Sequence, residues 1–310
     1  MYIAQAYNHL HDWWRYLLPI AGLLGLSALN YAVILLLDID VDTIIKEEIA
    51  KKGSNRVFLE NIAPMALFLV ALFVWVKYVH KQSIRSLTTA RKKIDWGRFW
   101  FGFGIIAVTT IVLTGIDYYA NPDDYVLQFD LVPFLFLALI AIIFIPLQTS
   151  FEEYMFRGYL MQGIGVLAKN KWVPLVLTSI IFGGLHFLNP EVEKLGSVMM
   201  VYYIGTGFFL GIITLMDDGL ELALGFHAGN NLVAALLLTA DWTVFQTNSV
   251  LKDVSEPSAG FDIIAPVFII YPIFIGIMAW RYKWTGWKDK LLGKVEPPPL
   301  IEEDTIDYVH

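Results

Sequence analysis

Eight long runs of apolar residues divide the chain, and short polar connections separate them. A helix that crosses a hydrocarbon core of about 30 Å needs roughly 17–25 residues. The runs lie at 16–37, 62–79, 99–119, 131–148, 173–188, 197–216, 220–239 and 263–281. This pattern predicts an all-α fold, a polytopic membrane helix bundle with about eight transmembrane helices. The run at 173–188 is short, so re-entrance or burial within the bundle is an alternative for it.

The apolar runs follow one another without a long polar block between them. We therefore expect residues 1–295 to form a single integral-membrane bundle. Residues 296–310 differ from the rest, since they are acidic and include three consecutive prolines. Such a composition is typical of disordered segments, so the sequence predicts a disordered tail.

Composition agrees with a membrane protein. Hydrophobic residues make up 57% of the chain and charged residues 16%, whereas soluble domains carry about 25% charged residues. The net charge of −7 comes largely from the tail at 296–310, which carries five acidic residues and no Lys or Arg, and no basic stripe is present. We expect a lipid bilayer as partner and no nucleic acid. Because the chain has no cysteine, disulfides and thiolate chemistry are excluded.

Positively charged residues indicate the orientation of the bundle. Lys and Arg are concentrated in the connections at 80–98 and 281–294, and such connections face the cytoplasm. An even number of spans then places both termini in the cytoplasm. The connection at 38–61 disagrees, because it carries four basic residues on the opposite side. The first apolar run is too long for a signal peptide, so we expect it to be retained as a span. Because the sequence shows no retention signal, we expect an integral protein of a prokaryotic cytoplasmic membrane.

Three ionisable residues interrupt the apolar sequence after the fourth run. Glu153 and Arg157 have the i,i+4 spacing of a helical ion pair, while Glu152 points about 100° away around the helix. Charged residues inside a membrane protein are costly and usually functional. The structural alternative is a capping box formed by Ser150 and Glu153. We expect these residues to open a helix over 150–167.

Two further polar sites follow. His186 ends an apolar run, where a lone histidine is more often structural than catalytic. His227 and Asn231 share one face of a helix by their i,i+4 spacing. A paired imidazole and carboxamide are costly in a membrane unless they have partners. We therefore expect these sites and Glu152 to converge on one cavity.

Other small and charged residues in this part of the chain have plainer interpretations. Gly207 and Gly211 have the spacing that lets helices approach closely, so we interpret them as packing residues. Asp217, Asp218 and Glu221 fall in a short connection, so we interpret them as solvated loop charges.

The order Glu-Glu-x-x-x-Arg, Phe-x-x-x-His and His-x-x-x-Asn resembles the CAAX protease and bacteriocin-processing family of intramembrane endopeptidases. The resemblance covers about 148–238. It implies hydrolysis of a peptide bond by water that Glu152 activates as general base with His186 as its partner. It further implies that His227 and Asn231 stabilise the oxyanion, and that Glu153 and Arg157 form a supporting ion pair.

The resemblance leaves the cofactor and the substrate open. In the alternative interpretation the enzyme depends on zinc, which is bound by a mixed set of ligands: Glu152, His186, His227 and Asn231. However, the sequence lacks His-Glu-x-x-His and carboxamides rarely bind zinc, so we expect no cofactor. The substrate is expected to be a membrane-associated peptide or protein. The competing hypotheses are a proton-coupled transporter that uses the same residues as a relay, and a non-proteolytic scaffold.

Overall fold

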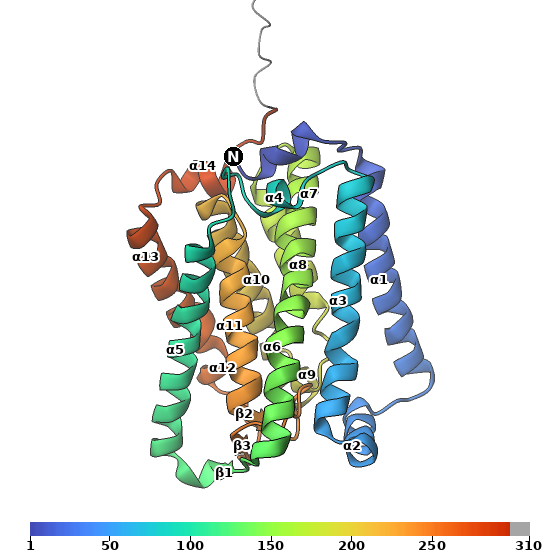
Figure 1. Cartoon of the computed structure of the whole chain (residues 1–310), viewed down its shortest axis with the longest axis vertical. Coiled ribbons are helices and arrows are strands. Elements are labelled where there is room, and N and C mark those ends of the chain that lie inside the picture. Colours follow the sequence, from blue (N-terminus) through green and yellow to red (C-terminus); the bar gives the residue numbers. More distant parts are fainter. Residues whose placement is uncertain (298–310) are drawn as a thin grey trace, which may run out of the picture.

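The computed structural model describes residues 1–297, apart from the side chain of Asp262. Helices form nearly all of it (Figure 1). The α-helices are α1 (Trp13–Leu36), α2 (Val41–Lys52), α3 (Ser54–Tyr78), α4 (Ile84–Thr88), α5 (Trp96–Ala120), α6 (Leu131–Glu153), α7 (Met161–Ala168), α8 (Trp172–Gly184), α9 (Pro190–Leu195), α10 (Val198–Asp217), α11 (Glu221–Leu237), α12 (Phe261–Ala265), α13 (Tyr271–Tyr282) and α14 (Trp287–Leu292). Shorter elements are the 3₁₀ turns η1 (Ile3–Asn8) and η2 (Pro122–Asp124) and the π-helical segments η3 (Tyr154–Leu160) and η4 (Pro266–Ile270). Residues 298–310, which hold most of the predicted disordered tail, lie outside the described part.

The predicted all-α polytopic bundle is confirmed, and each of the eight apolar runs is helical. Within the described residues, six helices are long and apolar enough to cross a membrane. They are α1, α3, α5, the continuous run Leu131–Ala168, α10 and the run Ile263–Tyr282. The other two runs form α8, with 13 residues, and α11, with 17 residues. α8 is short for a full crossing and α11 is at the lower limit of length, so the count of eight spans is not confirmed.

The fourth apolar run does not end before the glutamate pair. α6, η3 and α7 form one helix of 38 residues from Leu131 to Ala168, so the expectation that a new helix begins at Ser150 was wrong. The capping interpretation fails with it, because no helix end is present there to cap. The residues between Pro146 and Gly158 include no glycine that would favour a helix end. The helix continues and changes to a π-helical segment directly after Glu153. Such segments are rare and often mark functional sites.

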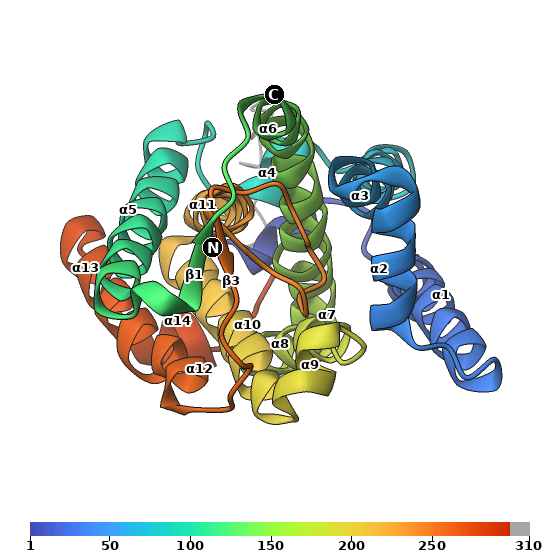
Figure 2. The same ribbon diagram turned by 90° about the horizontal axis from the view of Figure 1, so that it is seen from below.

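α11 lies at the centre of the bundle, between α5, α6 and α10 (Figure 2). Close approach explains its glycines: a Cβ on Gly225 would stand 1.9 Å from the Phe99 carbonyl oxygen of α5. Gly207 of α10 approaches the backbone of Ser179 on α8 in the same way, at 2.8 Å from its carbonyl oxygen. Gly207 and Gly211 thus pack α10 against α8, as their spacing predicts, and Gly225 packs α11 against α5.

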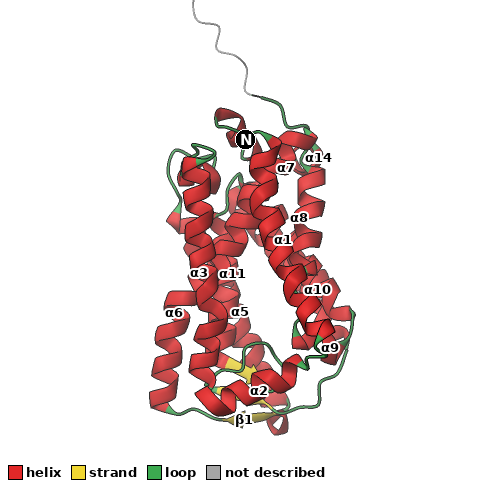
Figure 3. Ribbon diagram, turned by 90° about the vertical axis from the view of Figure 1, so that its right-hand side faces the viewer, coloured by secondary structure: helices red, strands yellow, loops and turns green. Residues whose placement is uncertain are grey.

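A small sheet closes one end of the bundle, shown in yellow in Figure 3. Its strands are β1 (Tyr125–Leu127), β2 (Leu238–Ala240) and β3 (Leu251–Asp253), in the order β1-β3-β2. β1 is antiparallel to β3 and β2 is parallel to it. The sequence analysis did not predict this sheet, since each strand has only three residues and lacks a readable alternation.

The opposite end carries the N-terminus and the last described residues (Figures 1 and 3). Here the interpretation of three acidic residues as solvated loop charges was wrong for two of them, because Asp217 and Glu221 are buried. Arg91 contacts both, with distances of 2.6 Å to Asp217 Oδ2 and 3.0 Å to Glu221 Oε2. Arg98 also pairs with Asp217. The connection from α3 to α5 folds over the α10–α11 corner and supplies Arg91, and the first turn of α5 supplies Arg98.

Candidate active site

The glutamate pair divides its two side chains between different environments. The Glu153 side chain is 0% exposed and accepts a hydrogen bond from Arg157 Nη1 at 2.9 Å. Arg157 is also 0% exposed, and its Nη2 donates to the Gly207 carbonyl of α10 at 3.3 Å. The Glu152 side chain keeps 13% of its surface exposed. Glu153 is thus fixed within the protein, while Glu152 keeps part of its side chain exposed.

His227 of α11 lies between these two carboxylates. Its Nδ1 is 2.8 Å from Glu153 Oε1, and its Nε2 is 3.5 Å from Glu152 Oε2. An ionised carboxylate oxygen only accepts hydrogen bonds, so Nδ1 must donate to Glu153. The contact orients the ring and points Nε2 toward Glu152. Glu153 lies on α6, Arg157 on η3 and His227 on α11. These three elements therefore meet in one buried ionic cluster.

Gln148, which the sequence analysis did not select, connects Glu152 to Asn231. Its Nε2 donates to Glu152 Oε1, and its Oε1 accepts from Asn231 Nδ2 at 3.4 Å. One amide orientation satisfies both bonds, because the carboxylate only accepts. Gln148 stands one turn before Glu152 on α6, so the signal available in the sequence was its i,i+4 spacing. Asn231 Oδ1 in turn accepts from Asn230 at 3.1 Å.

His186 is placed apart from this network. It follows the end of α8, and its Nδ1 is 2.8 Å from the Phe182 carbonyl oxygen. A carbonyl only accepts, so Nδ1 carries a proton and Nε2 is the nitrogen available to another partner. The Phe182 ring links the two imidazoles, with ring centroids 4.9 Å from His186 and 6.0 Å from His227. Phe182 also lies 4.1 Å beneath the Arg157 guanidinium, a cation–π contact.

The structure therefore brings five of the six selected residues into direct contact or one hydrogen-bond network: Glu152, Glu153, Arg157, His227 and Asn231. The sixth, His186, adjoins this network through an aromatic side chain. The side chain that faces Glu152 directly is His227 rather than His186. Spacing along the sequence does not reveal this, because the choice depends on how α8 and α11 rotate against α6.

Zinc fits this set of donors poorly. Catalytic zinc sites use three protein ligands and a water, whereas among residues 1–297 no three His, Cys, Asp or Glu side chains converge on a point that could hold a metal ion. Glu152 faces His227 at Nε2, whereas Glu153 meets the same ring at Nδ1, so the two carboxylates do not share one point with the imidazole. We therefore derive no chemical step through a metal.

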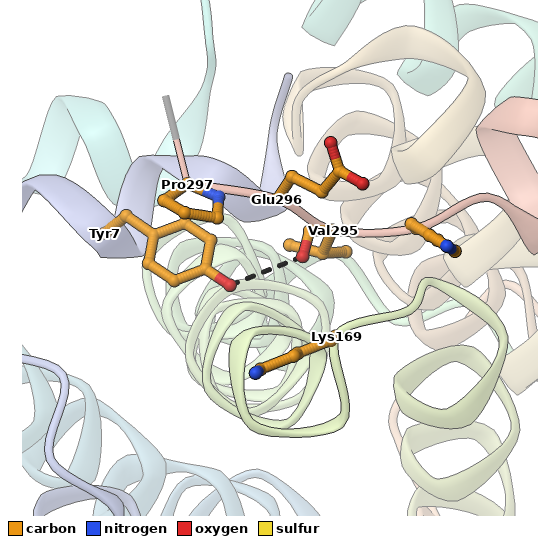
Figure 4. Close-up of a pocket in the computed structure, with 6 residues that line it drawn as sticks. Tyr7, Lys169, Val295, Glu296 and Pro297 are labelled. Atoms are coloured by element: carbon orange, nitrogen blue, oxygen red, sulfur yellow. Dashed lines mark hydrogen bonds between the residues drawn. The ribbon is translucent and has the colours of Figure 1, made fainter. Parts of the chain in front are cut away.

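An open pocket is separate from this site and lies at the end of the bundle that carries the N-terminus and the last described residues (Figure 4). Tyr7, Lys169 and Val295 line it together with neighbouring residues, and the Tyr7 hydroxyl donates to the Val295 carbonyl at 3.3 Å. None of its lining residues belongs to the network around Glu152. The pocket therefore gives no information about the catalytic candidates.

A helical membrane bundle with an ionisable network of this kind belongs to the class of polytopic membrane proteins with a buried polar site. A family model described as type II CAAX prenyl endopeptidase Rce1-like matches residues 131–233, which include all six selected residues. The chain is 30% identical over 280 residues to an uncharacterized protein, YyaK, of Bacillus subtilis (strain 168), covering 87% of this chain and 92% of that protein. The chain belongs to the Rce1-like family, so the resemblance seen in the motifs is confirmed. No solved structure matches it.

Proposed function

We propose that this protein is an intramembrane endopeptidase that hydrolyses a peptide bond with a water activated by Glu152. One observation carries the proposal: an accessible carboxylate faces an imidazole whose other nitrogen is held by a buried glutamate–arginine pair. Family membership supports it, since the matching family is named for endopeptidases. A transporter or a scaffold has no comparable observation in its favour.

The chemistry proceeds from the roles that each atom can take. Glu152 removes a proton from water, and the water oxygen forms a bond to the carbonyl carbon of the substrate. The carbonyl electron pair moves to oxygen. His227 acts here as the imidazolium, which keeps Nδ1–H on Glu153 and donates Nε2–H to the oxyanion, and Asn231 Nδ2–H donates to it as well. The C–N bond then breaks, and the proton held by Glu152 passes to the leaving nitrogen. One water is consumed, and Glu152 returns to its ionised form.

The remaining residues hold this arrangement. Glu153 and Arg157 fix His227 through Nδ1, which leaves its Nε2 directed at the reaction centre. His186 presents Nε2 as an acceptor and orients the attacking water by taking a hydrogen bond from its second proton. We further propose that the reaction needs no metal, that the substrate is a membrane-associated peptide or protein, and that the protein belongs to a prokaryotic cytoplasmic membrane.

Comparison of protein termini in membranes tests the proposal. Uncleaved precursors are measured in three membranes, which contain the wild-type protein, Glu152→Ala or Glu47→Ala. Glu47→Ala is the control, because it removes an exposed carboxylate on α2. We expect precursors to accumulate only with Glu152→Ala. Identical termini in all three membranes would contradict the proposal and favour a transporter or scaffold.

A separate experiment tests whether the activity depends on a metal. Purified wild-type protein is treated with a zinc chelator, and its processing of the precursor found above is compared before and after treatment. Unchanged processing is expected if Glu152 activates water directly. Loss on chelation, with recovery on adding zinc, would favour the zinc-dependent alternative.

A further inference from the structure

His186 stands where no regular helix orients its side chain. α8 ends at Gly184, and the backbone continues in a tight turn in which the His186 N–H donates to the Gly183 carbonyl at 3.0 Å. A side chain on such a turn has no helical neighbours to fix its direction. Catalytic geometry must be held within about 0.5 Å by packing and supporting hydrogen bonds. Contacts from other elements must therefore supply the support.

Tyr203 of α10 supplies a stacking contact. Its ring stacks on the His186 imidazole, with centroids 4.4 Å apart and planes inclined by 21°. The Tyr203 hydroxyl accepts a hydrogen bond from Asn189 Nδ2 at 3.2 Å. Asn189 lies in the same turn, and its backbone N–H donates to the His186 carbonyl at 3.0 Å. One tyrosine thus holds both the ring of His186 and the turn that carries it.

The orientation of the imidazole follows from two restraints acting together. The hydrogen bond from Nδ1 to the Phe182 carbonyl fixes one edge of the ring, and the stack on Tyr203 fixes its plane. Rotating the ring about the Cβ–Cγ bond would break both. With both in place, the Nε2 edge has a single direction. Without the stack, the hydrogen bond and the contact with the tilted Phe182 ring would remain, and the ring plane would lose its stacked partner.

We propose that Tyr203 is a positioning residue that holds the His186 imidazole in the orientation required to bind the attacking water. The proposal rests on the proposed function, because it assigns a catalytic purpose to the orientation of His186. The aromatic ring is the essential part, since stacking restrains the plane. The hydroxyl contributes only through Asn189.

Two substitutions separate the ring from the hydroxyl. Tyr203→Phe keeps the stack and removes the bond to Asn189, whereas Tyr203→Leu removes the stack. The spectroscopic readout uses protein labelled with carbon-13 in the histidine rings. The chain has six histidines, and the peak lost in His186→Ala identifies residue 186. We expect this peak to move in Tyr203→Leu, because the ring current of the tyrosine is lost, and to stay near its position in Tyr203→Phe.

The catalytic readout is the rate of processing of the precursors that accumulate with Glu152→Ala. Tyr203→Leu should lower the turnover rate by about tenfold with an unchanged KM, because the reacting groups are misplaced while substrate binding is kept. Tyr203→Phe should retain the parent rate. In a His186→Ala background, Tyr203→Leu should cause no further loss. Tyr119→Leu, at a tyrosine 85% exposed on α5, serves as the control for loss of an aromatic ring.

The outcomes distinguish the two proposals. An unmoved His186 peak in Tyr203→Leu would overturn the stack itself. A moved peak with the same fall in rate in both backgrounds would overturn positioning, since the tyrosine would then act independently of His186. A moved peak in a protein that shows no processing dependent on Glu152 would overturn the proposed function and the catalytic role of Tyr203, leaving only a structural stack.

Discussion

Arg157 and Glu153 illustrate how strongly single residues depend on one another inside this bundle. Both side chains are fully buried, and the pair is also contacted by His227 and by the Gly207 carbonyl, while Glu153 Oε2 and Arg157 Nε have no partner among the described residues. Taking two charges from water is costly, and their mutual attraction offsets that cost only when the geometry is good. Removing one partner therefore leaves the other charge buried without compensation.

Substitution of Arg157 by Met tests this dependence. We expect the free energy of unfolding to fall by about 3–5 kcal/mol, the usual result of breaking a buried ion pair. Unfolding in detergent, followed by circular dichroism, measures it. The control is Arg56→Met, which removes an i,i+4 pair with Glu60 at a side chain 68% exposed. That change should cost at most about 1 kcal/mol, and equal losses in the two variants would contradict the account.

Glu191 on α9 gives a prediction about pH. Burial raises the pKa of its carboxyl above the ordinary value of 4.5; Oε1 accepts from the Val244 N–H at 2.9 Å, and Oε2 is buried without a partner among the described residues. The folded protein therefore holds this proton to higher pH than the unfolded chain does. Its contribution to stability is complete below pH 4.5 and declines as pH rises toward the raised folded value.

Replacing Glu191 by Gln removes this titration while keeping an oxygen for Val244. The melting temperature of the variant, relative to the wild type, should rise as the pH increases from below 4.5 to neutral. Thermal melts across that range provide the measurement, with Glu193→Gln on the same helix as control. A constant difference at all pH values would show that Glu191 does not titrate in this range.

At the level of helices, the position of α11 decides the geometry of the site. His227 and Asn231 both project from α11, and Gly225 allows this helix to lie directly against α5. A methyl group at Gly225 would overlap the Phe99 carbonyl oxygen at 1.9 Å, and a rigid backbone cannot yield there as a side chain can. Displacement of α11 would carry its two polar side chains away from α6.

Gly225→Ala should therefore reduce both stability and processing. Overpacking of this kind costs about 1–3 kcal/mol, and processing of the precursor should fall further than the loss of folded protein explains. Gly104→Ala on α5, where a Cβ would meet nothing within 4 Å, is the matched control. It should be neutral or slightly stabilising, as alanine is a better helix former. Retained processing in Gly225→Ala would contradict the role given to α11.

The helices themselves were readable from the sequence, because long apolar runs have few alternatives in a membrane. Their ends and partners were not. Nothing local distinguishes a helix that begins at Ser150 from one that passes through it, since the same Glu153 carboxylate could cap a helix or pair with Arg157. Contacts between helices decided the matter, as the buried pair with His227 shows.

For the molecule as a whole, the two basic connections and both described ends lie on the same side (Figure 1). The sequence predicted this shared side through the distribution of Lys and Arg. It did not predict that Arg91 and Arg98 turn inward to Asp217 and Glu221. The number of Lys and Arg residues predicts the side of the membrane on which a connection lies. Whether a particular arginine is buried depends on a partner more than a hundred residues away in the sequence.

Orientation in the membrane can be tested directly because the chain lacks cysteine. Single cysteines replace Lys93 in the basic connection and Asp123 in η2 at the opposite end, both exposed positions. A membrane-impermeant maleimide should label Asp123→Cys in intact cells and Lys93→Cys only after the membrane is opened. The reverse pattern would place both termini outside the cytoplasm.

The role of Glu152 as the base that activates water is tested most directly in reconstituted liposomes. Wild-type protein and Glu152→Gln, which keeps the size and hydrogen-bonding oxygen of the side chain, are compared for the rate at which each cleaves the precursor. We expect Glu152→Gln to fold and insert normally and to lose activity by at least about 10²-fold, the range for removal of a general base. Cleavage by Glu152→Gln at the wild-type rate would contradict the account.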